Sequence, residues 1–231
     1  MEERRSDRLA GWAGILFSAL SLVVFPLVLT PPAPPVVGQS GAEVALWFDL
    51  HRTGFLVGNY LGVAAFLPGF VQLSVLAARI RRAEGEGGFL AALVLTTGTF
   101  GYAVFACSLI AFQAMPFLLA PHLHGSIEAL GSLTAVWFAL DGLAAFPLVI
   151  SVGIATVATR VLPAWFARVS WVVAVLALAM SIGALTTTPS WLAAGGIVTG
   201  VGFIGFFVWT FVLGVVFLRR KPERDHPASG A

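Results

Sequence analysis

The sequence predicts an all-α fold: a polytopic bundle of six transmembrane helices, with one short helix at the membrane interface. Hydrophobic residues make up 58% of the 231 residues, only 10% are charged, and the mean hydropathy is +0.94. About a quarter of the residues in a soluble domain are charged, so this composition indicates an integral membrane protein. Long uncharged stretches separated by short polar or proline-rich segments supply the predicted helices.

The first span is predicted at about residues 9–30, after the polar start MEERRSDR, because these 22 residues carry no charge. Four prolines between positions 31 and 35 stop this helix. A basic start before an apolar run is also typical of a signal peptide. The length of this run and the lack of a small-residue cleavage site favour an uncleaved anchor.

Ser40 and Glu43 then form a predicted capping box, which opens the short interfacial helix toward Trp47 and Phe48. The second span is predicted at about residues 54–79. Pro68 lies near its middle and predicts a kink.

The second half of the chain contributes the other spans. Pro116 ends the third span, and Pro147 predicts a kink in the fourth. The last 50 apolar residues must hold two spans, because residues 169–218 carry no charge and the segment 186–190 breaks them. These four spans are predicted at about 88–115, 129–159, 165–186 and 191–218. Residues 1–218 therefore form one transmembrane domain, and residues 219–231 form a polar cytoplasmic tail.

The basic residues predict the orientation of the chain. With the amino terminus in the cytoplasm, 12 of the 13 Lys and Arg residues lie on the cytoplasmic side, and only Arg52 lies outside. Loops rich in Lys and Arg stay on the cytoplasmic side of a membrane. The sequence therefore predicts a multi-pass protein of the cell (plasma) membrane with both termini in the cytoplasm.

Asp141 is the only acidic residue deep inside a predicted span. No cation lies at comparable depth, so the neutral carboxylic acid is favoured, and it can donate a proton or a hydrogen bond. Intramembrane acids are rare and costly, which favours a functional role over a protonated Asp that only binds a neighbouring helix. On a helix the face of this residue includes Thr134, Trp137, Phe138, Ala145 and Leu148.

Asp141, Tyr102 and Asn59 form the predicted catalytic set, because Tyr102 and Asn59 are the groups most able to hydrogen-bond the acid. The alternative for Asn59 and Tyr102 is that each only joins two helices. The predicted lining of a substrate site consists of Trp137, Phe138, Phe146, Tyr60 and Thr134. Membrane helices are normally rich in aromatic residues, so this lining also has a purely structural interpretation.

Polar residues on the predicted outer side form a candidate entrance, made of Glu43, Asp49, His51, Arg52 and Glu128. Asp49 and Arg52 are also close enough in sequence to pair locally. His122 and His124 belong to the same outer region, but a His-x-His pair on a loop is a weak zinc pattern. We therefore predict no metal.

The sequence contains no phosphate-binding GxxxxGK[ST], no HExxH and no GxSxG motif, and its single cysteine, Cys107, excludes an internal disulfide. We expect no cofactor and no nucleic-acid partner. The expected partners are the lipid bilayer and a lipophilic small molecule.

Two short stretches, Leu50–Leu56 (LHRTGFL) and Val161–Phe166 (VLPAWF), occur with the six-span layout. Together they resemble a broad group of small bacterial integral-membrane proteins with no assigned activity, and the resemblance covers most of the chain. The small size, the intramembrane acid and the aromatic interior also resemble the membrane-bound terpene cyclases. In that family a buried carboxylic acid protonates a polyprenyl epoxide or alkene. Its members have seven spans and a second intramembrane acid, neither of which is clear in this sequence.

Three functions follow as hypotheses. The first is a cyclase or isomerase acting on an isoprenoid-like substrate, with Asp141 as general acid and aromatic faces stabilising cationic charge. The second is a small carrier in which Asp141 couples transport to a proton, although the two halves of the chain show no internal repeat. The third is a non-catalytic membrane subunit or lipid-binding scaffold. The first is the leading hypothesis.

Overall fold

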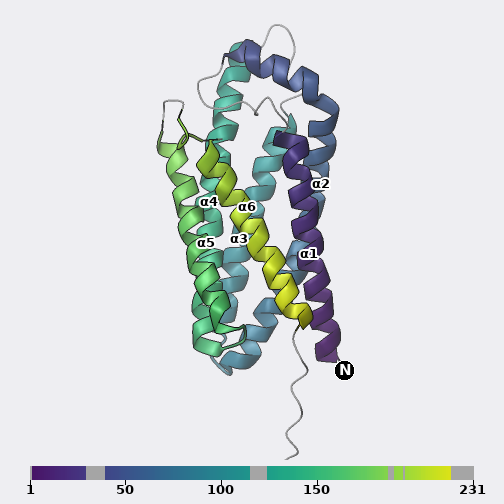
Figure 1. The fold of residues 1–231 in the computed structure, drawn as a ribbon, viewed down its shortest axis with the longest axis vertical. Helices are drawn as coiled ribbons and strands as arrows, with labels where there is room; N and C mark the ends of the chain where they lie inside the picture. The colour runs from purple at the N-terminus through teal and green to yellow at the C-terminus, as the bar shows by residue number, and fades with distance from the viewer. Residues whose placement is uncertain (1, 30–39, 115–123, 187–189, 195, 220–231) are drawn as a thin grey trace, which may run out of the picture.

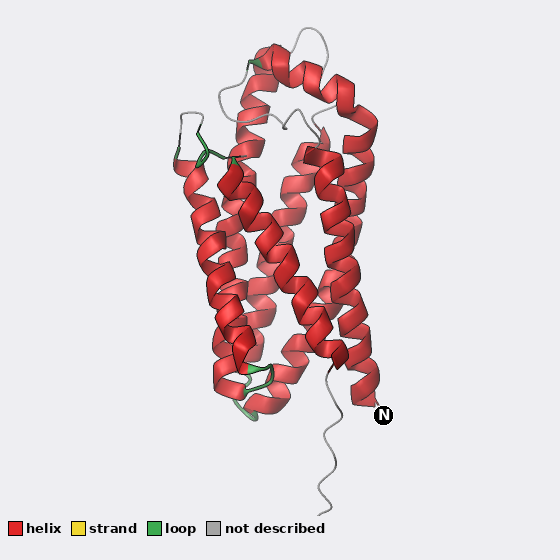
Figure 2. Ribbon diagram, viewed as in Figure 1, coloured by secondary structure: helices red, strands yellow, loops and turns green. Residues whose placement is uncertain are grey.

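The computed structural model describes residues 2–29, 40–114, 124–186, 190–194 and 196–219. This part of the chain consists of helices, turns and loops, and it contains no strand (Figure 2). The α-helices are α1 (Glu2–Leu29), α2 (Gly41–Glu84), α3 (Phe89–Ala114), α4 (His124–Thr159), α5 (Ala164–Ile182) and α6 (Ile197–Arg219), with the short 3₁₀ helix η2 (Gly183–Leu185) after α5. The predicted all-α class is confirmed.

The six α-helices form a closed ring in chain order (Figure 1). Each packs against the next, and α6 returns to pack against α1. Successive helices run in opposite directions, so the start of α1 and the end of α6 lie at the same end of the bundle (Figure 1). The ring encloses a central axis, toward which every helix presents one face.

Five of these helices are long and apolar enough to cross a membrane. Their apolar lengths are Ala45–Glu84, Phe89–Gln113, Val136–Thr159, Ala164–Leu185 and Ile197–Arg219. A water-soluble bundle buries its apolar residues, whereas here large apolar side chains such as Leu67, Val175 and Ile197 are exposed around the bundle. These helices therefore indicate a multi-pass protein in a lipid bilayer.

The interfacial helix expected before the second span is not separate, because it continues into that span as the single helix α2. The predicted capping box is present: Oγ of Ser40 accepts from the backbone N–H of Glu43, and the Glu43 carboxylate accepts from the backbone N–H of Ser40. No proline follows before Pro68, and Pro68 itself does not end the helix, so no residue stops it after a few turns. Figure 1 shows the first turns of α2 crossing over the bundle before the helix descends beside α1.

A buried ion pair joins the lower ends of α1 and α2. Arg79 of α2 is 7% exposed, and its Nε donates to Oδ1 of Asp7 at 2.9 Å. The same guanidinium pairs with the carboxylate of Glu3 and donates to its backbone carbonyl oxygen. These contacts explain why α1 begins at Glu2, well before the first apolar residue of the predicted span.

Replacing Arg79 by Met should destabilise the protein, because a buried carboxylate, Asp7, loses its cation. We expect a loss of about 3 kcal/mol, seen as a lower thermal denaturation midpoint in detergent. Arg82→Met is the matched control, since the Arg82 side chain is 60% exposed and touches only Glu3 at 3.4 Å. Equal midpoints for the two variants would contradict a stabilising role for the buried pair.

Candidate functional site

A small cavity lies on the axis of the ring and receives side chains from all six α-helices. Its volume is about 20 Å³, which is room for one water molecule. Seven of its 15 lining residues are aromatic: Phe17, Phe66, Tyr102, Phe105, Phe203, Phe206 and Phe207. Asp141 is the only charged residue among those that line the cavity. The acid that the sequence singles out therefore faces the interior of the bundle.

Asp141 lies at the middle of α4 and is 2% exposed. Its Oδ1 atom is 2.8 Å from Oγ of Ser108 on α3, whereas its Oδ2 atom has no hydrogen-bond partner. No Lys, Arg or His lines the cavity. A carboxylate at this place would have one hydrogen bond and no counter-charge, which is an unfavourable environment for an ion.

Ser108 has two neighbours that accept hydrogen bonds. Its Oγ atom lies 3.1 Å from the carbonyl oxygen of Val104 and 2.8 Å from Asp141. A hydroxyl group carries only one hydrogen atom, so it donates to one of these groups at a time. A protonated Asp141 satisfies both contacts, because it donates to Ser108 while Ser108 donates to Val104. The geometry fits a neutral acid better than an ionised one.

Gly142 lets α4 approach α5 beside the acid. A Cβ atom at this position would lie 2.3 Å from the carbonyl oxygen of Ala177, well inside van der Waals contact. The absence of a side chain thus brings the α4 backbone against the α5 backbone at the level of Asp141. This close packing keeps the cavity small on the side of α5.

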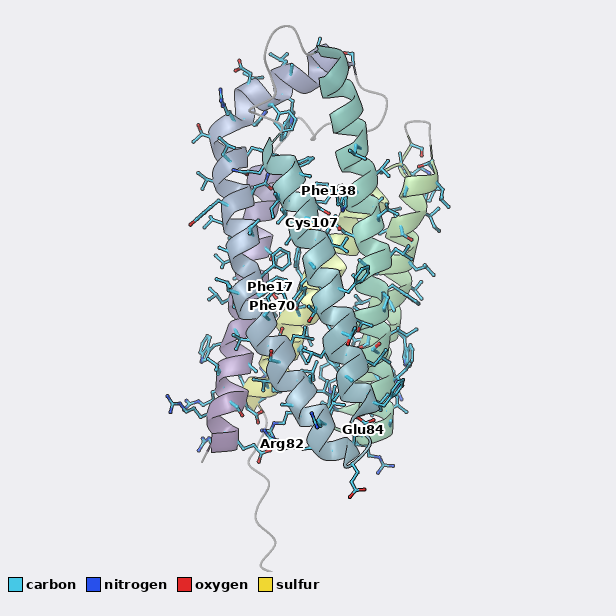
Figure 3. All side chains as sticks on the ribbon, turned by 180° about the vertical axis from the view of Figure 1, so that it is seen from behind. Phe17, Phe70, Arg82, Glu84, Cys107 and Phe138 are labelled. Atoms are coloured by element: carbon cyan, nitrogen blue, oxygen red, sulfur yellow. The ribbon has the colours of Figure 1, made fainter. Side chains whose placement is uncertain are left out.

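The rings around the cavity belong to helices that are far apart in sequence. Phe17 of α1 has its ring centroid 5.5 Å from Tyr102 of α3, 5.9 Å from Phe66 of α2 and 5.9 Å from Phe207 of α6. Figure 3 shows Phe17 near the middle of the bundle and Phe138 closer to the end where α2 begins. Ring faces attract positive charge, and the cavity combines several of them with one acid.

Of the predicted catalytic set, Tyr102 and Asp141 line the same cavity, and Asn59 does not. Asn59 of α2 is buried, and neither polar atom of its side chain has a hydrogen-bond partner. The structure thus shows no hydrogen bond between Asn59 and the acid. The partner that Asp141 does have is Ser108, which sequence reasoning missed.

Four of the predicted substrate-lining residues, Trp137, Phe138, Phe146 and Tyr60, are not among the residues that line the cavity. Phe138 is nearest to it, packing on Phe203 of the cavity wall with ring centroids 5.6 Å apart. Phe146 packs against the apolar core, Trp137 is half-buried, and Tyr60 is 72% exposed on the outer surface of α2. Thr134 lies in α4, and its side chain is outside the described part.

The described entrance residues, Glu43, Asp49, His51 and Arg52, lie near the start of α2. Glu43 caps α2, and the backbone N–H and hydroxyl of Ser40 hold the pKa of its carboxyl group below the usual value. His51 stacks on Trp47 at a centroid distance of 4.8 Å and hydrogen-bonds its carbonyl oxygen. Asp49 and Arg52 are exposed and form no ion pair with each other in the described structure.

The side chains of one entrance residue and of the predicted histidine pair lie outside the described part. Glu128 and His124 lie in α4 without described side chains, and His122 is outside the described residues. Among the side chains that are described, no group of three His, Cys, Asp or Glu residues could hold a metal ion.

The chain was compared with models of protein families, with curated proteins and with solved structures, and none of these comparisons found a match. The residues and their geometry alone therefore carry the functional argument.

Proposed function

We propose that this chain is an integral-membrane protein in which Asp141 gives a proton to a lipophilic molecule at the centre of the bundle. One observation carries the proposal. The only charged residue of the central cavity is an acid with an unpaired oxygen atom, surrounded by aromatic rings and by no cation. Buried acids without a counter-charge keep their proton and can act as general acids.

The leading form of the proposal is an acid-catalysed isomerase or cyclase for an isoprenoid-like substrate. Protonation of an alkene or epoxide by Asp141 would leave a carbocation next to the faces of Phe17, Phe203 and Phe207. These faces favour the cation over the neutral ground state, which lowers the barrier. Loss of a proton from the rearranged carbocation to the Asp141 carboxylate would form the neutral product and restore the acid. No cofactor is needed for this cycle.

The volume of the cavity sets a condition on this chemistry. Ligand sites for drug-sized molecules occupy roughly 300–1,000 Å³. The space beside Asp141 is about 20 Å³, so an isoprenoid substrate requires neighbouring helices to separate.

The same small volume favours a second candidate, a carrier that exchanges a proton for a lipophilic cation. An alternating-access carrier passes through occluded states, and an acid among aromatic rings is suited to either a proton or an organic cation. The enzyme and the carrier differ in what happens to the bound molecule. The enzyme changes the covalent structure of its substrate, whereas the carrier releases a proton when a cation binds.

One pair of assays on purified protein separates them. Polyprenyl alkenes and epoxides are incubated with the protein, and mass spectrometry detects a product of equal mass and different retention. Separately, tetraphenylphosphonium is added in weak buffer, and a pH indicator records proton release. We expect product formation that Asp141→Asn abolishes and Asp49→Asn leaves intact. Release of about one proton per bound cation without product formation would favour the carrier. A negative result in both assays would leave the non-catalytic subunit or lipid-binding scaffold as the favoured hypothesis.

We further propose that α1 is the sixth span, with both termini in the cytoplasm of a bacterial cell. The uncharged stretch of α1 begins at Leu9, and the helix runs beside α2 and α6 along much of the bundle (Figure 1). The basic residues of the chain support this orientation through their predicted distribution.

Cysteine labelling tests the topology in a Cys107→Ser background. A membrane-impermeant maleimide added to intact cells should label Asp49→Cys, at the exposed outer end of α2. It should not label Glu86→Cys, at the exposed turn between α2 and α3, until the cells are opened. The reverse pattern would overturn the orientation. Labelling of both positions in intact cells would contradict a membrane span between residues 49 and 86.

A further inference from the structure

A second, larger hollow lies at the end of the bundle where α1 begins. It has a volume of about 660 Å³ and lies between the α4–α5 turn and the last turns of α6. Figure 1 shows the reason: α6 crosses the bundle diagonally, from α5 at one end to α1 at the other, so that α5 and α6 separate here. We call this hollow the α5–α6 groove.

The α5–α6 groove is basic at its mouth. Arg160, directly after α4, and Arg219, at the end of α6, both line it, and both are exposed. None of its lining residues is acidic. Among the described residues, two guanidinium groups from separate elements line one opening and no carboxylate does, which favours an anion.

Arg160 adopts a backbone conformation that an arginine rarely takes. Its φ is +54°, in the left-handed region, and its backbone N–H donates to the carbonyl oxygen of Thr156 at 3.0 Å to close α4. Glycine or asparagine is favoured at such a helix end. An arginine here places a guanidinium at the groove although a less strained residue could end the helix equally well.

The inner part of the groove is apolar. Phe211 and Val215 of α6 form one wall, and Trp165 of α5 stands opposite, 48% exposed. Phe211 and Arg219 are eight residues apart, which is about 12 Å along the helix axis. The groove therefore runs from a basic mouth at the end of the bundle toward the apolar middle. Tryptophan beside arginine is typical of the level of lipid headgroups.

We propose that the α5–α6 groove binds one anionic phospholipid. Its phosphate would contact Arg160 and Arg219, and the upper part of one acyl chain would lie along Phe211 and Val215. This site is separate from the Asp141 cavity and does not depend on the chemistry proposed there. Two cations favour a lipid with a net negative headgroup over a zwitterionic one, since each arginine near the headgroups raises the binding constant for an anionic lipid about fivefold.

Native mass spectrometry of the full chain in detergent tests the proposal, with dioleoyl phosphatidylglycerol or dioleoyl phosphatidylcholine added in turn. We expect the first copy of phosphatidylglycerol to bind at least about tenfold more tightly than phosphatidylcholine. The preference should disappear in Arg160→Gln/Arg219→Gln. It should persist in Arg81→Gln/Arg168→Gln, which removes the same charge from exposed positions outside the groove. Equal losses in both double variants would overturn a specific site.

Two further variants separate lipid binding from folding. Arg160→Gly removes the left-handed strain, so its thermal midpoint should stay the same or rise while its preference for phosphatidylglycerol falls. Val215→Trp keeps both charges and fills the apolar part, so it should weaken binding as well. Unchanged lipid preference in Arg160→Gly would overturn the proposal.

Other occupants of the groove have distinct outcomes. Complete competition by millimolar inorganic phosphate would show a site for free anions, and a dimer that Val215→Trp dissociates would show a site for a second copy. Either result would overturn the lipid assignment. We expect neither.

Discussion

Asp141→Asn should remove one protonated carboxyl group from the infrared spectrum at pH 7. The C=O stretching band of a neutral carboxylic acid is well separated from the bands of a carboxylate. We expect this band in the wild-type protein, and we expect its complete loss in the variant. The reason is that Asp141 is 2% exposed, has one hydrogen-bonding neighbour and shares its cavity with no cation. Asn keeps the size and can still bind Ser108, so the variant should fold.

Asp49→Asn is the control, because Asp49 is exposed near the start of α2 and does not line the Asp141 cavity. Its replacement should leave the neutral-acid band unchanged. Turnover or proton release should follow the band: lost in Asp141→Asn and kept in Asp49→Asn. A wild-type spectrum without the band would show an ionised Asp141 and remove the general acid from the proposed function.

The helical class and most helix positions could be predicted from the sequence, because a span needs only length and lack of charge. The prediction failed where a helix continues without a stop signal. Residues 44–53 contain no proline or glycine, so nothing ends the helix that Ser40 caps, and it joins the span as α2. The early start of α1 had a different cause. It depends on Arg79, which lies more than seventy residues away in the sequence.

The site could be predicted in part. Asp141 was found by its charge alone, and Ala145 and Leu148 of its predicted face do line the cavity. Trp137 and Phe138 are on that side of α4 as well, but they lie about one turn beyond the cavity, toward the start of the helix. The aromatic wall comes from α1, α2, α3 and α6, and the order of helices around the ring decides which rings meet. That order depends on packing between segments that are distant in the sequence. The residue pattern within one helix gives no information about it.

Ser108 left a weaker signal. It is one of few hydroxyl residues in an otherwise apolar helix, and α3 and α4 are consecutive and antiparallel, so residues at equal depth can be matched. Ser108 and Asp141 are 33 positions apart and lie on facing sides of these two helices. Depth matching favours Ser108 over Tyr102, which lies six residues away, about 9 Å along the helix axis. It does not show which side of α3 faces α4, because that depends on the rotation of α3 about its axis.

Gly142→Ala should be among the most damaging single-methyl changes in the described bundle. The new Cβ atom would lie 2.3 Å from the carbonyl oxygen of Ala177 and 3.1 Å from Cβ and Cγ of Met180. Rotation of the Met180 side chain can move its Cγ atom away, but the Met180 Cβ atom and the Ala177 carbonyl oxygen are fixed to the backbone of α5 and cannot move in this way. Relief therefore requires α4 and α5 to separate beside Asp141. We expect a loss of about 2–3 kcal/mol and a lower thermal midpoint in detergent.

Gly200→Ala is the matched control, since Gly200 lies inside α6 and a Cβ atom there meets nothing within 4 Å. Alanine is the better helix former, so this variant should be as stable as the wild type or slightly more stable. The two variants add the same methyl group to a glycine inside a helix, and only the contact with α5 distinguishes them. If α4 and α5 also separate at the Asp141 cavity in Gly142→Ala, the neutral-acid band of this variant should shift relative to wild type, while that of Gly200→Ala should not. Equal thermal midpoints for the two variants would mean that α4 and α5 are not held in close contact at Gly142, and the small volume of the Asp141 cavity would lose its explanation.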